Sequence, residues 1–328
     1  MRVVVVGPYP PRRDGVAAYV SAQVDRLRSE GHEVTVISPT DGNGDIRVPF
    51  RLSGRPFREA AEVGEHADRI DVHFQPSLYY RPRAAVSKVR TSLALLRLCR
   101  SRSQTRILVH EADRPKLWRP DYAWLRAAFR AAPVLLFHTA SERAQLERDY
   151  HIEVKANLVD HREGIRVHER LSRKQARKRL GIPLDEPLFV SAGFLHPDKG
   201  YDRAIEAVHR TGAGRLVVLG SVRQGSPTNL EYARRLRELA GGGVEVVERY
   251  LAEEELDLWT TAADAVVLPY RRSWSSGALA RAQAIGTPAI VTAVGGLAEQ
   301  ATERDLVVDD DDELDRALRQ VASSRGAA

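Results

Sequence analysis

The stretch that decides the fold class is VVVVGPYPPRRDGVAAYVSAQVDRLRSEGHEVTVI, residues 3–37. Val3–Val6 are β-branched and end at a glycine, which predicts a short buried strand. Apolar side chains then recur at helical spacing, at Val16, Val20, Val24 and Leu27. Val34–Ile37 predict a second strand. A strand, a helix and a strand in this order predict a parallel sheet that is covered by helices.

The same alternation continues to about residue 160. Further strands are expected at Ile70–Phe74, Ile107–His110 and Val134–Phe137, and Ser141 with Glu142 suits the start of the next helix. We therefore predict one doubly wound, Rossmann-like α/β domain over residues 1–160.

The second half of the chain repeats this pattern after a charged segment. Residues 161–187 are mostly charged and contain Gly181 and Pro183, so we expect a linker there. Strands are then expected at Leu188–Ala192, Leu216–Leu219, Val244–Val247, Ala265–Leu268 and Ala289–Val291, with helices between them. We predict a second Rossmann-like domain over 188–310, a C-terminal helix and tail over 311–328, and a ligand-binding cleft that the two domains face.

Composition fits a two-domain globular protein. The chain has 328 residues, of which 43% are hydrophobic and 29% charged, and this excludes a disordered or fibrous protein. The one cysteine, Cys99, is interpreted as a buried apolar residue rather than a nucleophile, and it suits a reducing compartment. The first apolar run stops at Gly7, too early for a signal peptide, and no run is long enough to cross a membrane. We expect a cytoplasmic protein.

The loop from Gly7 to Gly15 joins the first strand to the first helix. Gly15 would let the backbone approach a ligand, and the amino end of a helix favours an anion. The loop has neither the dinucleotide-binding nor the P-loop glycine pattern, which weakens both interpretations. A purely structural loop remains the alternative.

Two loops of the second domain also suit an anion. Lys199 stands just before Gly200 and a helix, where an ammonium and backbone N–H groups could clamp a diphosphate. After the strand at 265–268, Ser275, Ser276 and Gly277 lead into a helix, with Arg271 and Arg272 nearby. The alternatives are a solvated lysine and an ordinary helix cap.

Three histidines stand at the carboxyl ends of expected strands: His73, His110 and His138. A lone histidine at such a place is usually structural, but all three would stand where we expect the cleft. No group of residues has zinc-ligand spacing, and no nucleophile motif of an acyl transferase is present, so we expect neither a metal site nor acyl transfer.

Residues 81–106 carry eight Lys or Arg side chains and no acidic residue. Val86, Val89, Leu93 and Leu96 follow helical spacing, so the segment suits a basic amphipathic helix for an anionic membrane or a phosphorylated acceptor. The alternative is a helix that packs on the sheet with its arginines in water. Nucleic acid is not expected as a partner, because aromatic residues are not interleaved with the basic ones and no known module is present.

These segments together resemble a GT-B glycosyltransferase, most similar to family 4, whose members are retaining and use nucleotide sugars. The resemblance rests on Val3–Pro11 with Asp14 and Gly15, Glu30–Val34, Val190–Phe194 with Lys199 and Gly200, Val267–Arg271, and above all Ser276–Pro288 with Gly295–Glu299. It covers nearly the whole chain and implies transfer of a hexose from a nucleotide sugar to a glycan, lipid-linked or small-molecule acceptor, with retention of configuration.

The resemblance also assigns roles to residues. His110 matches the histidine near the transferred sugar, and Lys199 the lysine on the diphosphate; we expect these two to be catalytic. Expected substrate-binding residues are Asp14, Gly15, His73, Glu111, Arg271, Arg272, Ser275, Ser276, Gly277, Ala278, Leu279 and Glu299. The nucleotide sugar is a co-substrate, and no cofactor or metal is expected.

The sequence departs from the family pattern at three positions. Phe194 stands where members often carry arginine, and Ser273 and Arg281 stand where they commonly carry two glutamates. Two alternatives therefore stay open. One is a catalytically weak or inactive nucleotide-sugar-binding protein of this fold. The other is a nucleotide-sugar epimerase, for which Glu111 and Glu299 are the candidate acid and base.

Overall fold

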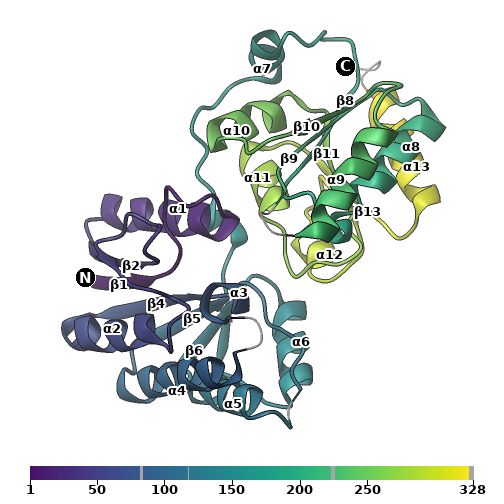
Figure 1. The fold of residues 1–328 in the computed structure, drawn as a ribbon. Helices are drawn as coiled ribbons and strands as arrows, with labels where there is room; N and C mark the ends of the chain where they lie inside the picture. Colours follow the sequence, from purple (N-terminus) through teal and green to yellow (C-terminus); the bar gives the residue numbers. More distant parts are fainter. Residues whose placement is uncertain (82–83, 117, 223–225, 325–328) are drawn as a thin grey trace. The chain divides into compact units, whose positions relative to one another are not determined.

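The chain folds into two compact α/β units, unit 1 over Met1–Gly164 and unit 2 over Ile165–Ala328 (Figure 1). A computed structural model describes residues 1–328 except 82–83, 117, 223–225 and 325–328. Each unit contains one sheet of parallel strands, with seven strands in unit 1 and six in unit 2. The expected pair of parallel α/β sheets is therefore confirmed.

Unit 1 is built around the first strand of the chain. Its elements are β1 (Arg2–Val6), α1 (Gly15–Ser29), β2 (Glu33–Ser38), β3 (Ile46–Arg47), α2 (Arg55–Val63), η1 (Gly64–His66), β4 (Arg69–Phe74), α3 (Pro76–Tyr79), α4 (Ala85–Ser101), β5 (Thr105–Val109), α5 (Pro120–Ala131), β6 (Val134–Phe137), α6 (Ala140–Tyr150), β7 (Ala156–Leu158) and η2 (His161–Gly164). The strand order is β3-β2-β1-β4-β5-β6-β7. Because the order reverses at β1, the loops after β1 and β4 diverge there, where α/β sheets bind ligands.

Helices cover both faces of this sheet. In Figure 1, α1 lies on one face and α2, α4 and α5 on the other. Val3 and Val5 of β1 pack against Val20 and Val24 of α1, so the apolar stripe that the sequence indicates is the buried one. This packing fixes α1 over the carboxyl ends of the strands that carry the histidines.

Unit 2 has the same architecture. Its elements are α7 (Arg173–Leu180), β8 (Leu188–Ala192), η3 (Pro197–Lys199), α8 (Tyr201–Thr211), β9 (Arg215–Gly220), α9 (Pro227–Leu239), β10 (Val244–Glu248), α10 (Glu253–Ala262), β11 (Ala265–Leu268), α11 (Gly277–Ile285), β12 (Ala289–Thr292), α12 (Leu297–Gln300), β13 (Leu306–Val308) and α13 (Asp311–Ser324). The strand order is β10-β9-β8-β11-β12-β13. Here the order reverses at β8, which pairs with β9 and β11.

The segment 161–187, expected as a linker, is shared between the units. Its first residues form η2 in unit 1, because Gly164 lies against the ring of Tyr19 so closely that a Cβ at position 164 would overlap the ring. The helix α7 follows in unit 2 and packs on α10. The helix at the end of the chain, α13, packs on α8 and is thus part of unit 2.

None of the helices in the described part of the chain combines the length and the apolar character that a bilayer crossing needs.

Candidate functional site

Four histidines gather around the ring of Tyr19 at the carboxyl ends of the unit 1 strands. His73 belongs to β4, His110 and His138 follow β5 and β6, and His161 belongs to η2. Their ring centroids lie 5.2 to 5.8 Å from that of Tyr19, which α1 supplies. We call these five residues the histidine cluster.

The cluster is tightly connected. Nδ1 of His73 lies 3.0 Å from Nε2 of His110, and Nε2 of His73 lies 2.7 Å from Oε1 of Gln23. The rings of His138 and His161 stack with centroids 3.9 Å apart. Gly7, which directly follows β1, makes this packing possible. A Cβ at position 7 would lie 3.3 Å from the Cβ of His73 and even closer to a side chain of α1.

Burial makes these histidines poor bases. It lowers the pKa of His73 from 6.5 to about 4, and that of His138 to about 4 as well. Burial also lowers the pKa of His110 and of His161 well below 6.5. All four rings are therefore neutral at pH 7. Across the described residues, no group of three or more His, Cys, Asp or Glu side chains is arranged to hold a metal ion.

The other unit 1 residues predicted for the site surround this cluster less closely. Asp14 caps α1, since its side chain accepts a hydrogen bond of 2.9 Å from the N–H of Val16. A Cβ at Gly15 would meet no atom within 4 Å, so open space adjoins this backbone. Glu111 is exposed and accepts a hydrogen bond of 2.9 Å from Nε2 of Gln75. Among the predicted residues of unit 1, all of which the structure describes, only His73 and His110 are hydrogen-bonded to each other.

In unit 2, the loops after β8 and β11 pack on each other, and we call this region the β8–β11 edge. Gly200 has a φ of 62° and lies so close to β11 that a Cβ would stand 2.1 Å from the carbonyl oxygen of Pro269. The N–H of Arg271 donates to the carbonyl of Asp198 over 2.8 Å. This packing places Nζ of Lys199 3.8 Å from the centroid of the Tyr270 ring, a cation–π contact.

Arg271 is already engaged by a carboxylate. Its NH1 and NH2 donate to the two oxygens of Asp202 over 2.7 and 2.8 Å. Burial favours the neutral form of Asp202, but hydrogen bonds from Arg271 and Tyr232 outweigh it and lower the pKa of Asp202. Arg272 carries its charge at an exposed position. Arg271 thus stabilises the β8–β11 edge, and because Asp202 neutralises it, it adds little net positive charge there.

The start of α11 offers two backbone donors. Ser276 caps the helix by accepting from the N–H of Leu279, and its own N–H donates to Gln300. In the described structure the N–H groups of Gly277 and Ala278 have no protein partner. Leu279 is fully buried in the core, so its side chain cannot touch a ligand, whereas Gly277 is exposed.

Two more predicted residues stand near these donors. Ser275 is half-buried in the loop before α11, and Glu299 is exposed on α12. The loop before α12 is held against that before α11, because a Cβ at Gly295 would overlap the carbonyl oxygen of Ser273. The loops after β8 and β11 therefore bring four predicted residues to one edge of the sheet: Lys199, Ser275, Gly277 and Ala278. Glu299 lies beside this edge.

Arg281 is positively charged, whereas members of the family that the sequence resembles commonly carry a negatively charged glutamate at this position. Its guanidinium is buried and pairs with the carboxylates of Asp257 and Glu253 of α10. Ser273, at the other such position, donates to the carbonyl of Ser275 over 2.9 Å. These two residues hold the local structure of unit 2 together.

Sequence reasoning missed several residues of both regions. Tyr19 and Gln23 are one helical turn apart on α1, a spacing that could have placed both on the buried face. Asp202 stands in the first turn of α8, and no pattern in the neighbouring sequence indicates that it pairs with Arg271. His161 lies in the segment expected as a linker, and no pattern there indicates that it joins the other histidines.

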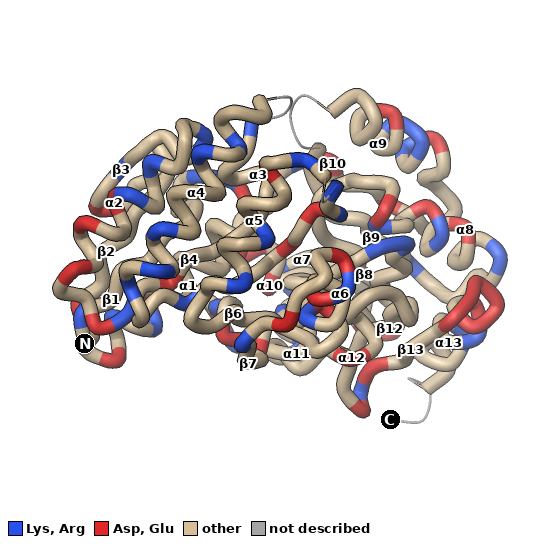
Figure 2. The backbone as a smooth tube through the Cα atoms, turned by 90° about the horizontal axis from the view of Figure 1, so that it is seen from below, with Lys and Arg blue, Asp and Glu red and all other residues tan. Residues whose placement is uncertain are grey.

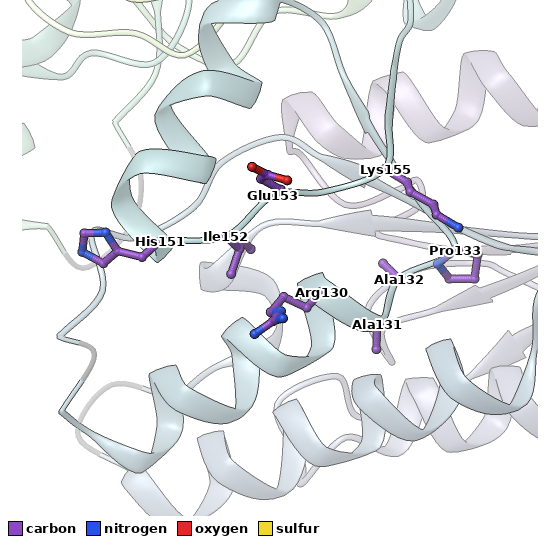
Figure 3. A pocket seen from close by; sticks show the side chains of 8 residues that line it. All are labelled: Arg130, Ala131, Ala132, Pro133, His151, Ile152, Glu153 and Lys155. Atoms are coloured by element: carbon purple, nitrogen blue, oxygen red, sulfur yellow. The ribbon is translucent and has the colours of Figure 1, made fainter.

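One surface groove lies away from both regions. It has a volume of about 590 Å³ and is lined by residues 130–133, 151–153 and 155 (Figure 3). Pro133 and Lys155 precede β6 and β7, so the groove adjoins the amino ends of these strands, opposite the histidines. A smaller groove on α4 and α5 is lined by Arg100, Arg126 and Arg130 among others.

Comparison with known proteins identifies the second half of the chain. Residues 186–324 match the family model described as "Glycosyl transferases group 1". A D-inositol 3-phosphate glycosyltransferase of Xylanimonas cellulosilytica is 37% identical over 141 residues, which are 42% of this chain and 32% of that protein. One of Geodermatophilus obscurus is 30% identical over 284 residues, or 79% of this chain and 60% of that protein. The chain thus spans about a third to three fifths of the length of these relatives.

Solved structures share the fold of the whole chain. Sucrose-phosphate synthase from Thermosynechococcus elongatus has a TM-score of 0.74 at 18% identity, covering 99% of this chain and 90% of its own. HepE of Anabaena, in complex with UDP-glucose, has a TM-score of 0.67 at 13% identity, covering 99% and 91%. The fold of the chain is therefore GT-B, and its second domain, over residues 186–324, matches the group 1 glycosyl transferases.

Proposed function

We propose that the chain transfers a hexose from a nucleotide sugar to a glycan, lipid-linked or small-molecule acceptor, with retention of configuration. The observation that carries this proposal is the β8–β11 edge, in the domain that matches the group 1 glycosyl transferases. There Lys199 lies over the ring of Tyr270, whose hydroxyl is 3.3 Å from Oγ of Ser276 at the start of α11, next to the N–H groups of Gly277 and Ala278. An ammonium and helix-start donors suit a diphosphate. The UDP-glucose complex of HepE supports a nucleotide sugar as the donor.

Under this proposal the edge acts on the leaving group. As the bond between the sugar and the diphosphate breaks, negative charge grows on the departing phosphate and positive charge on the sugar. Lys199 and the two N–H groups stabilise that phosphate electrostatically. The acceptor hydroxyl attacks from the face that the diphosphate leaves, and the phosphate takes up its proton. His110 contacts a hydroxyl of the transferred sugar, and Asp14 and Gly15 border the donor and acceptor.

Lys199→Ala tests the assigned edge. We expect donor turnover to fall at least roughly 100-fold, because one charge-assisted contact to the leaving group is worth about 3 kcal/mol. Lys178→Ala is the matched control, since Lys178 is exposed on α7 of the same unit. Transfer would be measured with a panel of UDP-, GDP-, ADP- and dTDP-sugars, chosen by the thermal stabilisation that each produces.

The outcomes separate the proposal from its alternatives. Turnover that is unchanged in Lys199→Ala would remove Lys199 from the mechanism. Binding of nucleotide sugar without transfer to any acceptor would favour an inactive binding protein. Conversion of the sugar nucleotide in the absence of an acceptor would favour an epimerase.

We also propose that α4 and α5 contact an anionic membrane. Val86, Arg90 and Arg97 are exposed along one stripe of α4, and Trp124 and Arg130 are exposed on α5. Blue segments recur along both helices in Figure 2. Basic side chains with an exposed tryptophan suit the headgroup region of an anionic bilayer.

Other parts of the basic segment 81–106 are used within the protein. Arg102 donates to the carbonyl of Ala61, and Arg106 pairs with Asp71, so neither is available to a lipid. Arg83 lies outside the described residues. Cys99 is buried, in keeping with a reducing compartment, so the proposed surface is the inner face of the cell membrane.

Vesicle co-sedimentation tests this contact. Arg97→Glu with Arg100→Glu should weaken binding to vesicles containing phosphatidylglycerol more than tenfold, because each cation near such a surface contributes about 1 kcal/mol. Arg304→Glu with Arg319→Glu, both exposed in unit 2, makes the same change in charge and should have less effect. Equal binding to neutral and anionic vesicles would contradict the proposal.

A further inference from the structure

A chain of hydrogen bonds leads from a buried carboxylate to His110. Asp71 of β4 is 3% exposed and pairs with Arg106 over 2.7 Å and Arg69 over 3.1 Å. Its Oδ2 also lies 3.0 Å from Nε2 of Gln23. A carboxylate held by two guanidinium groups only accepts hydrogen bonds. The amide nitrogen of Gln23 must therefore face Asp71, which turns Oε1 of Gln23 toward His73.

The orientation of Gln23 decides which nitrogen of His73 carries the proton. Oε1 of Gln23 only accepts, and it lies 2.7 Å from Nε2 of His73, so this nitrogen is the donor. His73 is fully buried, and burial keeps the ring neutral at pH 7. A neutral imidazole has one N–H, so Nδ1 of His73 is unprotonated.

His73 in turn decides the protonation of His110. The unprotonated Nδ1 of His73 lies 3.0 Å from Nε2 of His110 and can only accept, so Nε2 of His110 donates. Nδ1 of His110 then has a lone pair and no proton. Within the described structure this atom has no hydrogen-bond partner, and His110 is only half-buried.

Neither His138 nor Tyr19 competes for that atom. His138 uses Nδ1 to donate to the carbonyl of Val159 over 3.2 Å, which leaves its Nε2 without a proton. Tyr19 meets the ring of His110 edge to face and makes no hydrogen bond to it among the described contacts. The lone pair of His110 is therefore free for a ligand.

We propose that Asp71, Gln23 and His73 form a positioning relay that holds His110 with its proton on Nε2, so that Nδ1 can only accept a hydrogen bond from a ligand hydroxyl. The tautomer follows from the contacts of unit 1 alone. The identity of the hydroxyl as one of the transferred sugar rests on the proposed function. His110 thereby selects a substrate that presents a hydroxyl there, and a deoxy analogue leaves the lone pair without a donor.

The tautomer can be read directly by NMR. The full chain labelled with ¹⁵N-histidine would be studied at pH 7 through long-range ¹H–¹⁵N correlations, which distinguish the two ring tautomers, and His110→Gln would assign the signal. We expect His110 to be protonated on Nε2 and unprotonated on Nδ1. A spectrum with the proton on Nδ1, with two equally populated tautomers, or with a charged ring would overturn the proposal.

Gln23→Glu should reverse the relay. A carboxylate at position 23 cannot donate to Asp71, and it stabilises a charged His73 whose Nδ1–H donates to Nε2 of His110. The proton of His110 must then move to Nδ1. Gln104→Glu is the matched control, because Gln104 donates to the carbonyls of Gly64 and Ala67 away from the cluster. An unchanged His110 tautomer in Gln23→Glu would overturn the relay; if this variant does not fold, the spectrum of the unaltered chain decides the matter.

Steady-state kinetics distinguish a failure of the relay from a failure of the proposed function. In Gln23→Glu, kcat for sugar transfer should fall at least roughly tenfold, while KM for the nucleotide sugar stays within about twofold because unit 2 binds the diphosphate. A kcat equal to that of the unaltered chain would overturn the functional role of the relay. Absence of any transfer by the unaltered chain would contradict the proposed function and leave the NMR test of the tautomer intact.

Discussion

At the scale of single residues, Gly200 determines where Lys199 lies. Its φ of 62° is a left-handed conformation, and a Cβ would stand 2.1 Å from the carbonyl oxygen of Pro269. Backbone is hard to move, so a side chain at this position would force the loops after β8 and β11 apart. The ammonium of Lys199 would then leave its position over the Tyr270 ring.

Gly200→Ala is therefore expected to lower both stability and activity. The left-handed backbone alone costs about 1 to 2 kcal/mol with alanine, and the overlap adds to it, so we expect a loss of about 3 kcal/mol or more. Gly181→Ala is the control, because Gly181 has a similar φ of 66° but open space around its Cβ position. Urea denaturation would measure both. An equal loss in the two variants would show that the contact with Pro269 is unimportant.

Residue patterns predicted that these histidines stand at strand ends, but not which of them touch or how they are connected. The strand-end positions of His73 and His110 follow from local sequence, since parallel strands end at one edge of the sheet. Gln23 connects to them only because α1 packs on that edge, so its role depends on tertiary contacts. Asp202 was missed for the same reason: its partner, Arg271, is 69 positions away along the chain.

At the scale of elements, α10 and α11 are joined by the ion pairs of Arg281. Asp257 is buried and also accepts a hydrogen bond of 2.9 Å from the N–H of His168. A buried cation that satisfies two carboxylates cannot be exchanged for an anion without leaving three negative charges together. Restoring the family glutamate at position 281 would thus require changes in α10 as well.

Arg281→Glu should cost about 3 to 5 kcal/mol of stability and gain no nucleotide affinity. Arg281→Met, which keeps the volume and adds no negative charge, should cost less. Thermal unfolding of both variants checks the stability, and titration with nucleotide sugars checks the affinity. Tighter nucleotide binding in Arg281→Glu with stability unchanged would mean that these ion pairs do not oppose a carboxylate.

Strands that are buried apolar runs could be predicted from the sequence, whereas a strand that depends on its pairing partner could not. The strands at 134–137 and 265–268 have the predicted bounds, because each is a buried apolar run between turn residues. The strand β3 has two residues, Ile46–Arg47, and exists through its pairing with β2. From residue 85 onward, the basic segment 81–106 divides among α4, a turn and β5, because Thr105–Val109 pairs in the sheet.

At the scale of the whole molecule, the histidine cluster makes unit 1 sensitive to pH. It holds four neutral rings, of which His73 is buried and the other three are half-buried, and burial lowers the pKa of His73 and of His138 to about 4. In the unfolded chain these rings take up protons near pH 6.5, well before the folded unit does. Between these two pH values the unfolded state binds more protons, so stability rises with pH. The contribution of the cluster is present above pH 6.5 and is lost as the pH falls toward 4.

Unit 1 should therefore lose stability in mild acid. From pH 7 to pH 5, linkage gives a loss of about 2 kcal/mol each for His73 and His138, with further loss from His110 and His161. His161→Phe keeps an aromatic ring beside His138 and removes one titrating group, so it should flatten the pH dependence. Thermal unfolding from pH 7.5 to 5, with a fluorescence or NMR signal from each unit, would test this. A unit 1 transition that does not change with pH, or that His161→Phe leaves equally steep, would show that the rings are accessible to protons in the folded protein.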